Sequence, residues 1–443
     1  MNYPFWEVST LGGGLLIAIV AILHTYVAQF AVGGGFFLVL AERRARRERD
    51  MAMLDYVREH TRFFVLVTLV LGAVTGAGIW FTVALVNPQA TSILIRSFVW
   101  GWAIEWVFFI LEITAALTYH ATWDRVSPKT HELVGWLYGA GAWLSLAVIA
   151  GITSFMLTPG RWLETRSFWD GFFNPSYLPT VLMRTGVSFA LACLYGLLTA
   201  RKVVPLESRD RLVRYCAGWL FPAAALLVVG GLWYFQTIPE SSRAMLTGGA
   251  VAMTLAFAAS LVLSAVLFAA GYFGLYRNPR SYSVPLAVLL LVMGLLATGG
   301  GEFAREGVRK PYILYGYLYS NNVYAGQEQL IRQQGFLTTA RWARLDSHEI
   351  TAANLLEAGE EIYRFQCASC HTLGGYNDVT PLVAGWPREF IEFQLQHLNT
   401  VKPYMPPFVG TPMERRALAT FLASLNEPQA QATAPAVTLA SGY

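Results

Sequence analysis

Residues 11–41 read LGGGLLIAIVAILHTYVAQFAVGGGFFLVLA, and no Asp, Glu, Lys or Arg interrupts this run. A helix needs about 20 consecutive apolar residues to cross the hydrocarbon core of a bilayer. The run is too long, and too poor in small-residue cleavage signals, to be a removed leader peptide. It therefore predicts a helix that crosses the membrane and remains there.

Similar apolar runs recur along the first 301 residues and decide the fold class. Over the whole chain 55% of residues are hydrophobic and 14% are charged, whereas a typical soluble chain has about 25% charged residues. Ionisable side chains interrupt two of the runs, with Glu105 and Glu112 in one and Arg184 in another. The sequence predicts an all-α, polytopic transmembrane bundle of about eight helices, at 11–41, 63–86, 97–119, 133–160, 179–200, 215–237, 244–276 and 284–301.

Basic residues are distributed unevenly over the connections between these helices. The alternate connections near 42–62, 120–132, 201–214 and 276–283 contain 7, 2, 5 and 2 Lys or Arg residues, and the others contain Arg96, Arg161, Arg166 and Arg243. Cytoplasmic loops carry such an excess of positive charge. We therefore expect a bacterial inner-membrane protein with both termini on the periplasmic side. The small net charge of +4 gives no indication of a nucleic-acid partner.

The composition changes after Gly301, which predicts further parts of the chain beyond the bundle. We expect a transmembrane bundle at 1–301, a Tyr-rich periplasmic linker at 302–351 and a small soluble domain at 352–426. The last stretch, 427–443, is of low complexity and is expected to be disordered.

The soluble part contains a haem-attachment motif. Residues 367–371 read CASCH, the C-x-x-C-H pattern of covalent c-type haem attachment. Cys367 and Cys370 are expected to bond the haem, and His371 to be an axial iron ligand. Since c-type haem is attached outside the cytoplasm, the motif agrees with the orientation derived from the loops.

The order of segments around CASCH resembles class I cytochromes c. A helical segment precedes the motif, and a YMPPF turn and an amphipathic segment, ERRALATFLASL, follow it. The resemblance implies that Met405 of the turn is the second axial ligand, with Met413 as the alternative. A Met/His pair raises the haem potential and suits electron transfer. His397 is expected to be a surface residue.

Ionisable groups inside the spans are candidates for function, because each costs about 2.5–3.5 kcal/mol at mid-membrane on insertion scales. His24 is either a ligand or a hydrogen-bonded core residue. Glu105 and Glu112, seven residues apart, share a helix face and are either proton-handling groups or buried acids satisfied by neighbours. Further unusual residues gather at the outer ends of the spans: Arg184, Met245, Glu302, Arg305, Glu306 and Arg309.

The remaining histidines and cysteines of the bundle give weaker indications of function. Cys193 and Cys216 fall in apolar runs and are expected to be small buried hydrophobes. His60, His120 and His131 lie near the predicted cytoplasmic edge and are expected to be interfacial, with His120 also a candidate for a proton route.

Several of these motifs resemble subunit I of cytochrome bd oxidases. The shared features are a His in the first span followed by a run ending in LAE, an FFILE segment, the fourth-span sequence WLYGAGAWLSLAVIAGITSFMLTPG, FFNP at 172–175, and EGVRKPY near the end of the eighth span. The likeness covers roughly residues 11–320. It implies that His24 and Glu306 are axial ligands of two high-spin haems and that Glu112 is an acid beside them. Glu105 matches the family's second acid one position out of register.

The chain departs from that family in three places. The family's low-spin haem is held by a His and a Met; Met245 is present, preceded by Arg243, but Arg184 stands at the His position. The long loop that handles quinol shrinks to about QTIPESSR. The cytochrome c segment replaces the ninth helix.

Together the motifs and the resemblance imply a bd-like haem oxidoreductase that accepts electrons from a periplasmic c-type cytochrome and reduces a small oxidant, O2 first among the candidates. The expected cofactors are one covalent haem c and two non-covalent haems of b or d type. Besides the axial ligands, Met245 and Arg309 are expected to bind the non-covalent haems. Two alternatives stay open: an electron-transfer subunit without gas chemistry, and a nitric oxide reductase. Other membrane subunits or further copies of the chain, and membrane lipid, are the expected partners.

Overall fold

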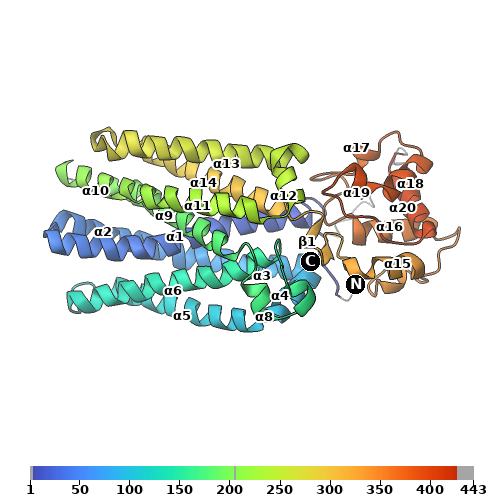
Figure 1. The fold of residues 1–443 in the computed structure, drawn as a ribbon, viewed down its shortest axis with the longest axis horizontal. Helices are drawn as coiled ribbons and strands as arrows, with labels where there is room; N and C mark the ends of the chain where they lie inside the picture. The colour runs from blue at the N-terminus through green and yellow to red at the C-terminus, as the bar shows by residue number, and fades with distance from the viewer. Residues whose placement is uncertain (1–2, 204–205, 427–443) are drawn as a thin grey trace, which may run out of the picture.

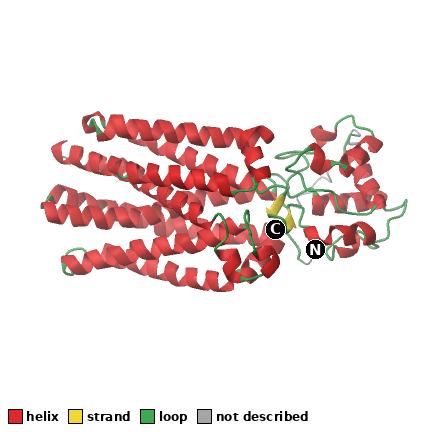
Figure 2. Ribbon diagram, in the orientation of Figure 1, coloured by secondary structure: helices red, strands yellow, loops and turns green. Residues whose placement is uncertain are grey.

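The protein consists of a long helical bundle with a smaller, mainly helical body at one end, as the computed structural model shows for residues 3–203 and 206–426 (Figures 1 and 2). The tail at 427–443, for which the sequence predicted disorder, lies outside the described residues.

Eight segments of the described chain are long and apolar enough to cross a membrane. This confirms the predicted all-α bundle. The spans are α1 (Gly13–Glu48); α2 (Met51–Val65), the π-helical η1 (Leu66–Leu71) and α3 (Gly72–Val86) as one; α5 (Val99–Ala121); α6 (Pro128–Phe155); α9 (Tyr177–Thr199) with η2 (Ala200–Lys202); α10 (Leu206–Gly218) with α11 (Leu220–Thr237); α13 (Val251–Ala269) with η4 (Ala270–Tyr276); and α14 (Val284–Gly307).

Short elements connect the spans, and one of them changes the predicted seventh span. They are α4 (Pro88–Ser97), α7 (Trp162–Thr165), α8 (Phe168–Phe172), α12 (Glu240–Ala244), η3 (Met245–Gly249) and η5 (Pro279–Ser281). The seventh span begins at Val251 rather than at 244, because the backbone leaves the helical conformation at Thr247 and at Gly248, where φ is 127°. Only glycine adopts such a φ at low cost. Met245 therefore precedes the span.

Three consecutive glycines allow α1 to lie close to its neighbours at the centre of the bundle. A Cβ at Gly33 would collide with the carbonyl oxygen of Ser188 on α9, one at Gly34 with the Phe64 ring, and one at Gly35 would lie 2.5 Å from the Tyr138 ring. Small residues are the usual means of such close helix approach in membranes. The sequence GGGFF thus serves helix packing here.

His60 and His131 were expected to be interfacial residues, but the side chains of both are buried between helices. Their exposed fractions are 0% and 1%. His131 Nδ1 lies 2.9 Å from both carboxylate oxygens of Glu42, which also accepts a 2.7 Å hydrogen bond from the Tyr119 hydroxyl. A buried acid on α1 thus supplies the partner that a membrane interface would otherwise provide.

The smaller body packs α16 (Leu355–Gln366) against α20 (Pro412–Ser424). The antiparallel strands β1 (Tyr312–Leu314) and β2 (Leu318–Tyr319) lie between the two parts (Figure 1), and Leu314 and Leu318 belong to an apolar cluster of the bundle. The other elements of the smaller body are η6 (Ala325–Gln327), α15 (Glu328–Gln334), η7 (Leu337–Thr339), α17 (Thr380–Val383), α18 (Arg388–Gln396) and α19 (Leu398–Val401).

Part of the predicted linker belongs to this second core. Glu414 forms the capping box of α20 together with the N-cap residue Thr411, and it also accepts 2.8 Å hydrogen bonds from the backbone amides of Phe336 and Leu337. Phe336 and Leu337 are each 1% exposed, in one apolar cluster with residues of α16 and α20. The helix α14 continues to Gly307, beyond the expected boundary at 301. The exact division of the chain into domains stays a prediction.

Candidate functional site

The CASCH loop directly follows α16, and its histidine is held in the tautomer that an iron ligand needs. The Nδ1–H of His371 donates to the Asn377 carbonyl oxygen at 3.2 Å, which leaves Nε2 with its lone pair free. The Asn377 side chain in turn donates to the Cys370 carbonyl oxygen at 2.7 Å. Both motif cysteines are free thiols. This donor set fits a covalently attached haem.

The two thiols lie in different electrostatic surroundings. Burial, together with the neighbouring Cys370, raises the pKa of Cys367 to about 12. Burial alone would also raise the pKa of Cys370, but the Lys310 ammonium and the hydrogen bonds from Ser369 and Lys310 outweigh it and hold this pKa below its usual value. Lys310 Nζ lies 3.3 Å from Cys370 Sγ. The lysine comes from the segment just after α14, so it joins the motif to the bundle.

Met405 lies in a loop that hydrogen bonds tie to α16. Gln366, the residue before the CASCH loop, donates to the Val409 carbonyl oxygen at 2.7 Å and accepts from the Val409 amide at 3.1 Å. Asn321 donates to the Pro407 carbonyl oxygen at 3.0 Å. The turn that carries Met405 is therefore fixed relative to the helix that precedes the cysteines. His397 is bonded to the Phe393 carbonyl oxygen.

The CASCH loop also contacts the beginning of α1. The Gly14 amide donates to the Ser369 carbonyl oxygen at 3.4 Å, and the Tyr376 amide donates to the Thr10 carbonyl oxygen at 2.8 Å. A Cβ at Gly375 would collide with the Thr10 backbone. These backbone contacts bring the smaller body to the end of the bundle at which α1 begins (Figure 1).

His24 lies further along α1, and its ring is oriented by α3. The Thr75 hydroxyl donates to the Leu71 carbonyl oxygen at 2.6 Å, so its oxygen accepts the Nδ1–H of His24 at 3.1 Å. In the described part of the chain Nε2 has no hydrogen-bond partner. A Cβ at Gly76 would lie 3.2 Å from the His24 ring, so glycine leaves room for the imidazole. This arrangement fits a metal ligand.

A cluster of ion pairs lies at the end of α14 near Lys310. Glu302 binds Arg305 at 2.9 Å and Arg184 of α9 at 3.5 Å. Glu306 binds Arg305 at 2.7 Å and also pairs with Arg309. Three arginines thus face two glutamates, which leaves one unbalanced positive charge. The Nε atoms of Arg184 and Arg309 are buried and have no hydrogen-bond partner in the described residues.

This cluster fits the neighbourhood of a non-covalent haem. The unpaired guanidinium N–H groups of Arg184 and Arg309 are donors of the kind that haem propionates need. Each Glu306 oxygen has two lone pairs, so its ion pairs leave an acceptor position. His24 and Glu306 therefore remain suitable iron ligands.

The residues do not fit the His/Met-held low-spin haem. Arg184 cannot ligate iron, and its guanidinium is paired with Glu302. When the Gln29 amide is oriented so that both its oxygen and its nitrogen have partners, the oxygen accepts a hydrogen bond from Arg184 Nη1 at 3.2 Å. Met245 is 2% exposed and packs among Leu157, Val308 and other apolar residues.

Glu105 and Glu112 project from α5 toward α6. The Ser145 hydroxyl donates to Glu105 at 3.2 Å, and the single Tyr138 hydroxyl hydrogen is shared between Glu112, at 3.2 Å, and the Ala31 carbonyl oxygen, at 3.0 Å. Each acid therefore has a neutral hydrogen-bond donor and no charged partner among the described residues. Such carboxyl groups can exchange a proton without breaking an ion pair.

Several residues of the site were missed by sequence reasoning. Thr75, which orients His24, and Gln29, which holds Arg184, are polar residues in apolar runs, and that is the signal that could have found them. Lys310 beside Cys370 had no such signal, because its partner is 60 positions away.

Comparison with known proteins assigns both parts of the chain. Residues 15–231 match the family model of cytochrome bd terminal oxidase subunit I, and residues 354–422 match that of cytochrome C oxidase, cbb3-type, subunit III. The solved structure of bd oxidase from Geobacillus thermodenitrificans is similar, with a TM-score of 0.57 and 17% identity, over 70% of this chain and 90% of that chain. At this identity the likeness shows the fold alone. No curated protein matched the sequence.

The bundle, the haem-attachment loop and the two family matches define an integral membrane haem oxidoreductase. The chain joins a membrane domain like subunit I of cytochrome bd oxidases to a C-terminal cytochrome c domain. These two domain types indicate haem c and b-type haem as cofactors.

Proposed function

We propose that this protein is a terminal oxidase-like enzyme of the bacterial inner membrane. It takes electrons from a periplasmic c-type cytochrome through its own haem c and reduces O2 at two non-covalent haems in the bundle. The cytochrome c domain and both termini lie on the periplasmic side in this proposal. The loops rich in Lys and Arg, which lie at the opposite end of the bundle, support that orientation.

The contact between the CASCH loop and the bundle is the observation that carries the proposal. Ser369 contacts the start of α1, the helix of His24, and Cys370 contacts Lys310, four residues after Glu306. Both candidate ligands of the membrane haems therefore belong to segments that contact the haem-attachment loop. Electrons can pass between the two parts of the protein without a movement of the domain.

The side chains divide into three roles. His24 and Glu306 would hold the two non-covalent haems, and Arg184 and Arg309 would bind anionic groups beside them. Bound haem supplies the one-electron chemistry and, where it is high-spin, an open position for a small oxidant. Cys367, Cys370, His371 and Met405 would hold haem c.

Glu105 and Glu112 are the proposed proton carriers. A carboxyl group in an apolar medium keeps its proton more readily than in water, and each acid is bonded only to a neutral hydroxyl. Tyr138 Oη links Glu112 to the backbone of α1 at Ala31. These acids can accept protons from the side opposite the cytochrome c domain and release them toward the reduced oxidant.

The test uses the purified holoprotein with a reduced soluble c-type cytochrome as donor and an oxygen electrode as readout. We expect O2 consumption by the wild type. Cys367→Ala, which prevents attachment through one thiol, should lose activity with the cytochrome donor. The same variant should keep the CO-induced spectral change of the dithionite-reduced membrane haems.

Other outcomes identify the alternatives. If the haems accept electrons from the cytochrome but neither O2 nor NO is consumed, the protein is an electron-transfer subunit. Consumption of NO alone would make it a nitric oxide reductase. Either result rejects the oxidase proposal.

A further inference from the structure

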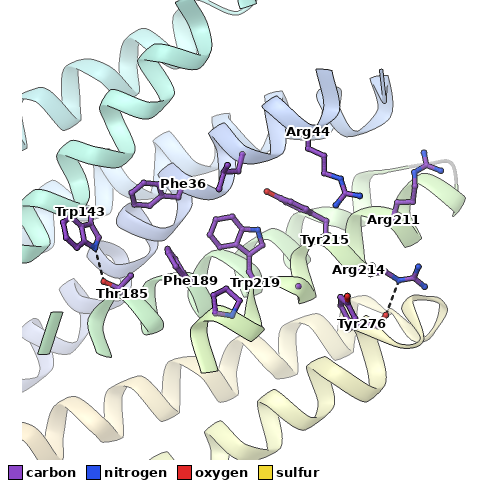
Figure 3. Close-up of a pocket in the computed structure, with 13 residues that line it drawn as sticks. Phe36, Arg44, Trp143, Thr185, Phe189, Arg211, Arg214, Tyr215, Trp219 and Tyr276 are labelled. Carbon is purple, nitrogen blue, oxygen red and sulfur yellow. Dashed lines mark hydrogen bonds between the residues drawn. The ribbon is translucent and has the colours of Figure 1, made fainter. Parts of the chain in front are cut away.

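A groove of about 910 Å³ opens on the bundle at the end opposite the cytochrome c domain. Residues of α1, α6, α9, α10, α11 and η4 line it. Figure 3 shows Arg44, Arg211 and Arg214 at one end of the groove and Trp143 and Thr185 at the other. The groove is separate from the haem sites described above, and none of the proposed roles uses it.

The outer end of the groove carries an unbalanced positive charge. Arg44 is paired with Glu48 at 3.1 Å, and Arg211 with Asp50 at 2.9 Å. Arg214 donates from Nε to the Tyr276 carbonyl oxygen at 3.3 Å and has no acidic partner among the described residues. Its remaining guanidinium N–H groups are available to an anion.

The inner part of the groove is lined by aromatic side chains. Phe36, Phe189 and Trp219 form its walls. At the inner end the Trp143 indole donates to the Thr185 hydroxyl at 3.1 Å, so these two polar groups satisfy each other. From Arg44 to Phe36 is eight residues of helix, or about 12 Å, which is close to the thickness of one leaflet of a hydrocarbon core of about 30 Å.

We propose that this groove binds one anionic phospholipid. Its phosphate pairs with Arg214, and an acyl chain lies between Phe189 and Trp219. The charge favours a lipid with a net negative headgroup, since a zwitterionic headgroup brings its own cation to a site that already holds three arginines. Basic residues at a membrane surface favour such lipids by about 1 kcal/mol each, which corresponds to about a fivefold change in affinity.

Native mass spectrometry of the full haem-loaded protein, delipidated in detergent and titrated with phosphatidylglycerol or phosphatidylcholine, tests the proposal. We expect one tightly retained phosphatidylglycerol and weaker retention of phosphatidylcholine. Arg214→Gln should weaken phosphatidylglycerol binding about fivefold. Arg280→Gln is the matched control, because Arg280 is an 89% exposed side chain near the same end of the bundle that does not line the groove, and it should bind as the wild type does.

A second variant tests the apolar part. The nearest atom to a Cβ at Gly218 is a Tyr276 ring carbon at 3.9 Å, so Gly218→Leu is accommodated by the helix and projects into the groove. It should abolish retention while the haem spectrum stays unchanged. Equal binding of the two lipids, or wild-type retention in both Arg214→Gln and Gly218→Leu, overturns the proposal. The proposal is also overturned if a helix of a partner protein occupies the groove and must be removed before any lipid binds.

Discussion

Replacing Glu302 with Gln tests the buried ion cluster most directly. Glu302 is 16% exposed and lies between Arg305, at 2.9 Å, and Arg184, at 3.5 Å. The change removes one negative charge from a cluster of three arginines and two glutamates, so the unbalanced charge rises from one to two. Breaking a buried ion pair by removing one partner costs about 3–5 kcal/mol. Because Gln keeps an acceptor oxygen for Arg305, we expect the lower end, about 3 kcal/mol.

The measurement is thermal unfolding of the purified protein, followed by tryptophan fluorescence and by haem release. The expected loss corresponds to a fall in Tm on the order of 5 °C for a chain of this size. Glu105→Gln is the matched control. Glu105 also lies within a span but accepts from the neutral Ser145, a bond that Gln can still accept, so less than about 1 kcal/mol is expected.

A double variant separates charge balance from a general loss of packing. Arg184→Gln combined with Glu302→Gln restores the unbalanced charge of one and should recover about 1–2 kcal/mol relative to Glu302→Gln alone, as coupled neighbours do. If Glu302→Gln melts with the wild type, or if the double variant is the sum of its singles, the account of the cluster as mutually stabilising charges is refuted.

Three further predictions concern the haems and the donor. Cys367→Ala should abolish haem-stained covalent attachment in a denaturing gel, and Met405→Ala should lower the c-haem potential while the haem stays attached; a wild-type chain without covalent haem would falsify the domain's role. His24→Ala should remove one non-covalent haem, and Glu306→Ala should perturb the other without changing the c haem, as read from reduced-minus-oxidised and CO difference spectra; if all membrane haems are low-spin and insensitive to CO, both ligand assignments fail. The protein should oxidise reduced cytochrome c roughly tenfold faster than a quinol, or more, because only the short segment 238–244 connects α11 to η3; quinol oxidation that survives loss of the c haem would contradict this.

The sequence predicted the number of spans well because each depends on a local property, an apolar run of sufficient length. The break at Thr247–Gly248 was not predictable, since both residues are tolerated inside a membrane helix and only the backbone reveals the change in φ. The burial of His131 was missed for a similar reason. Its partner Glu42 is 89 positions away, and the periodicity of α1 alone does not show which neighbour it meets.

The candidate site shows the same division between local and distant information. CASCH is a local pattern and predicted three site residues at once. Arg184 was recognised as a departure from the resembling family, but its partners Glu302 and Gln29 became visible only when α9, α14 and α1 were packed together. Contacts between distant segments depend on the packing of the whole bundle, which a single sequence does not report.

The contact of the CASCH loop with α1 and Lys310 also implies an order for the maturation of this protein. In the folded chain Thr10, Gly14 and Lys310 cover the loop on the side of the bundle. An enzyme that attaches haem to Cys367 and Cys370 needs both thiols and the surrounding backbone accessible. The loop is translated long after α1, and docking onto the bundle would cover it. We therefore expect haem attachment to precede docking, after which the loaded domain packs against a bundle already inserted in the membrane. A chain denied haem attachment should therefore accumulate as an inserted bundle whose C-terminal part remains sensitive to protease.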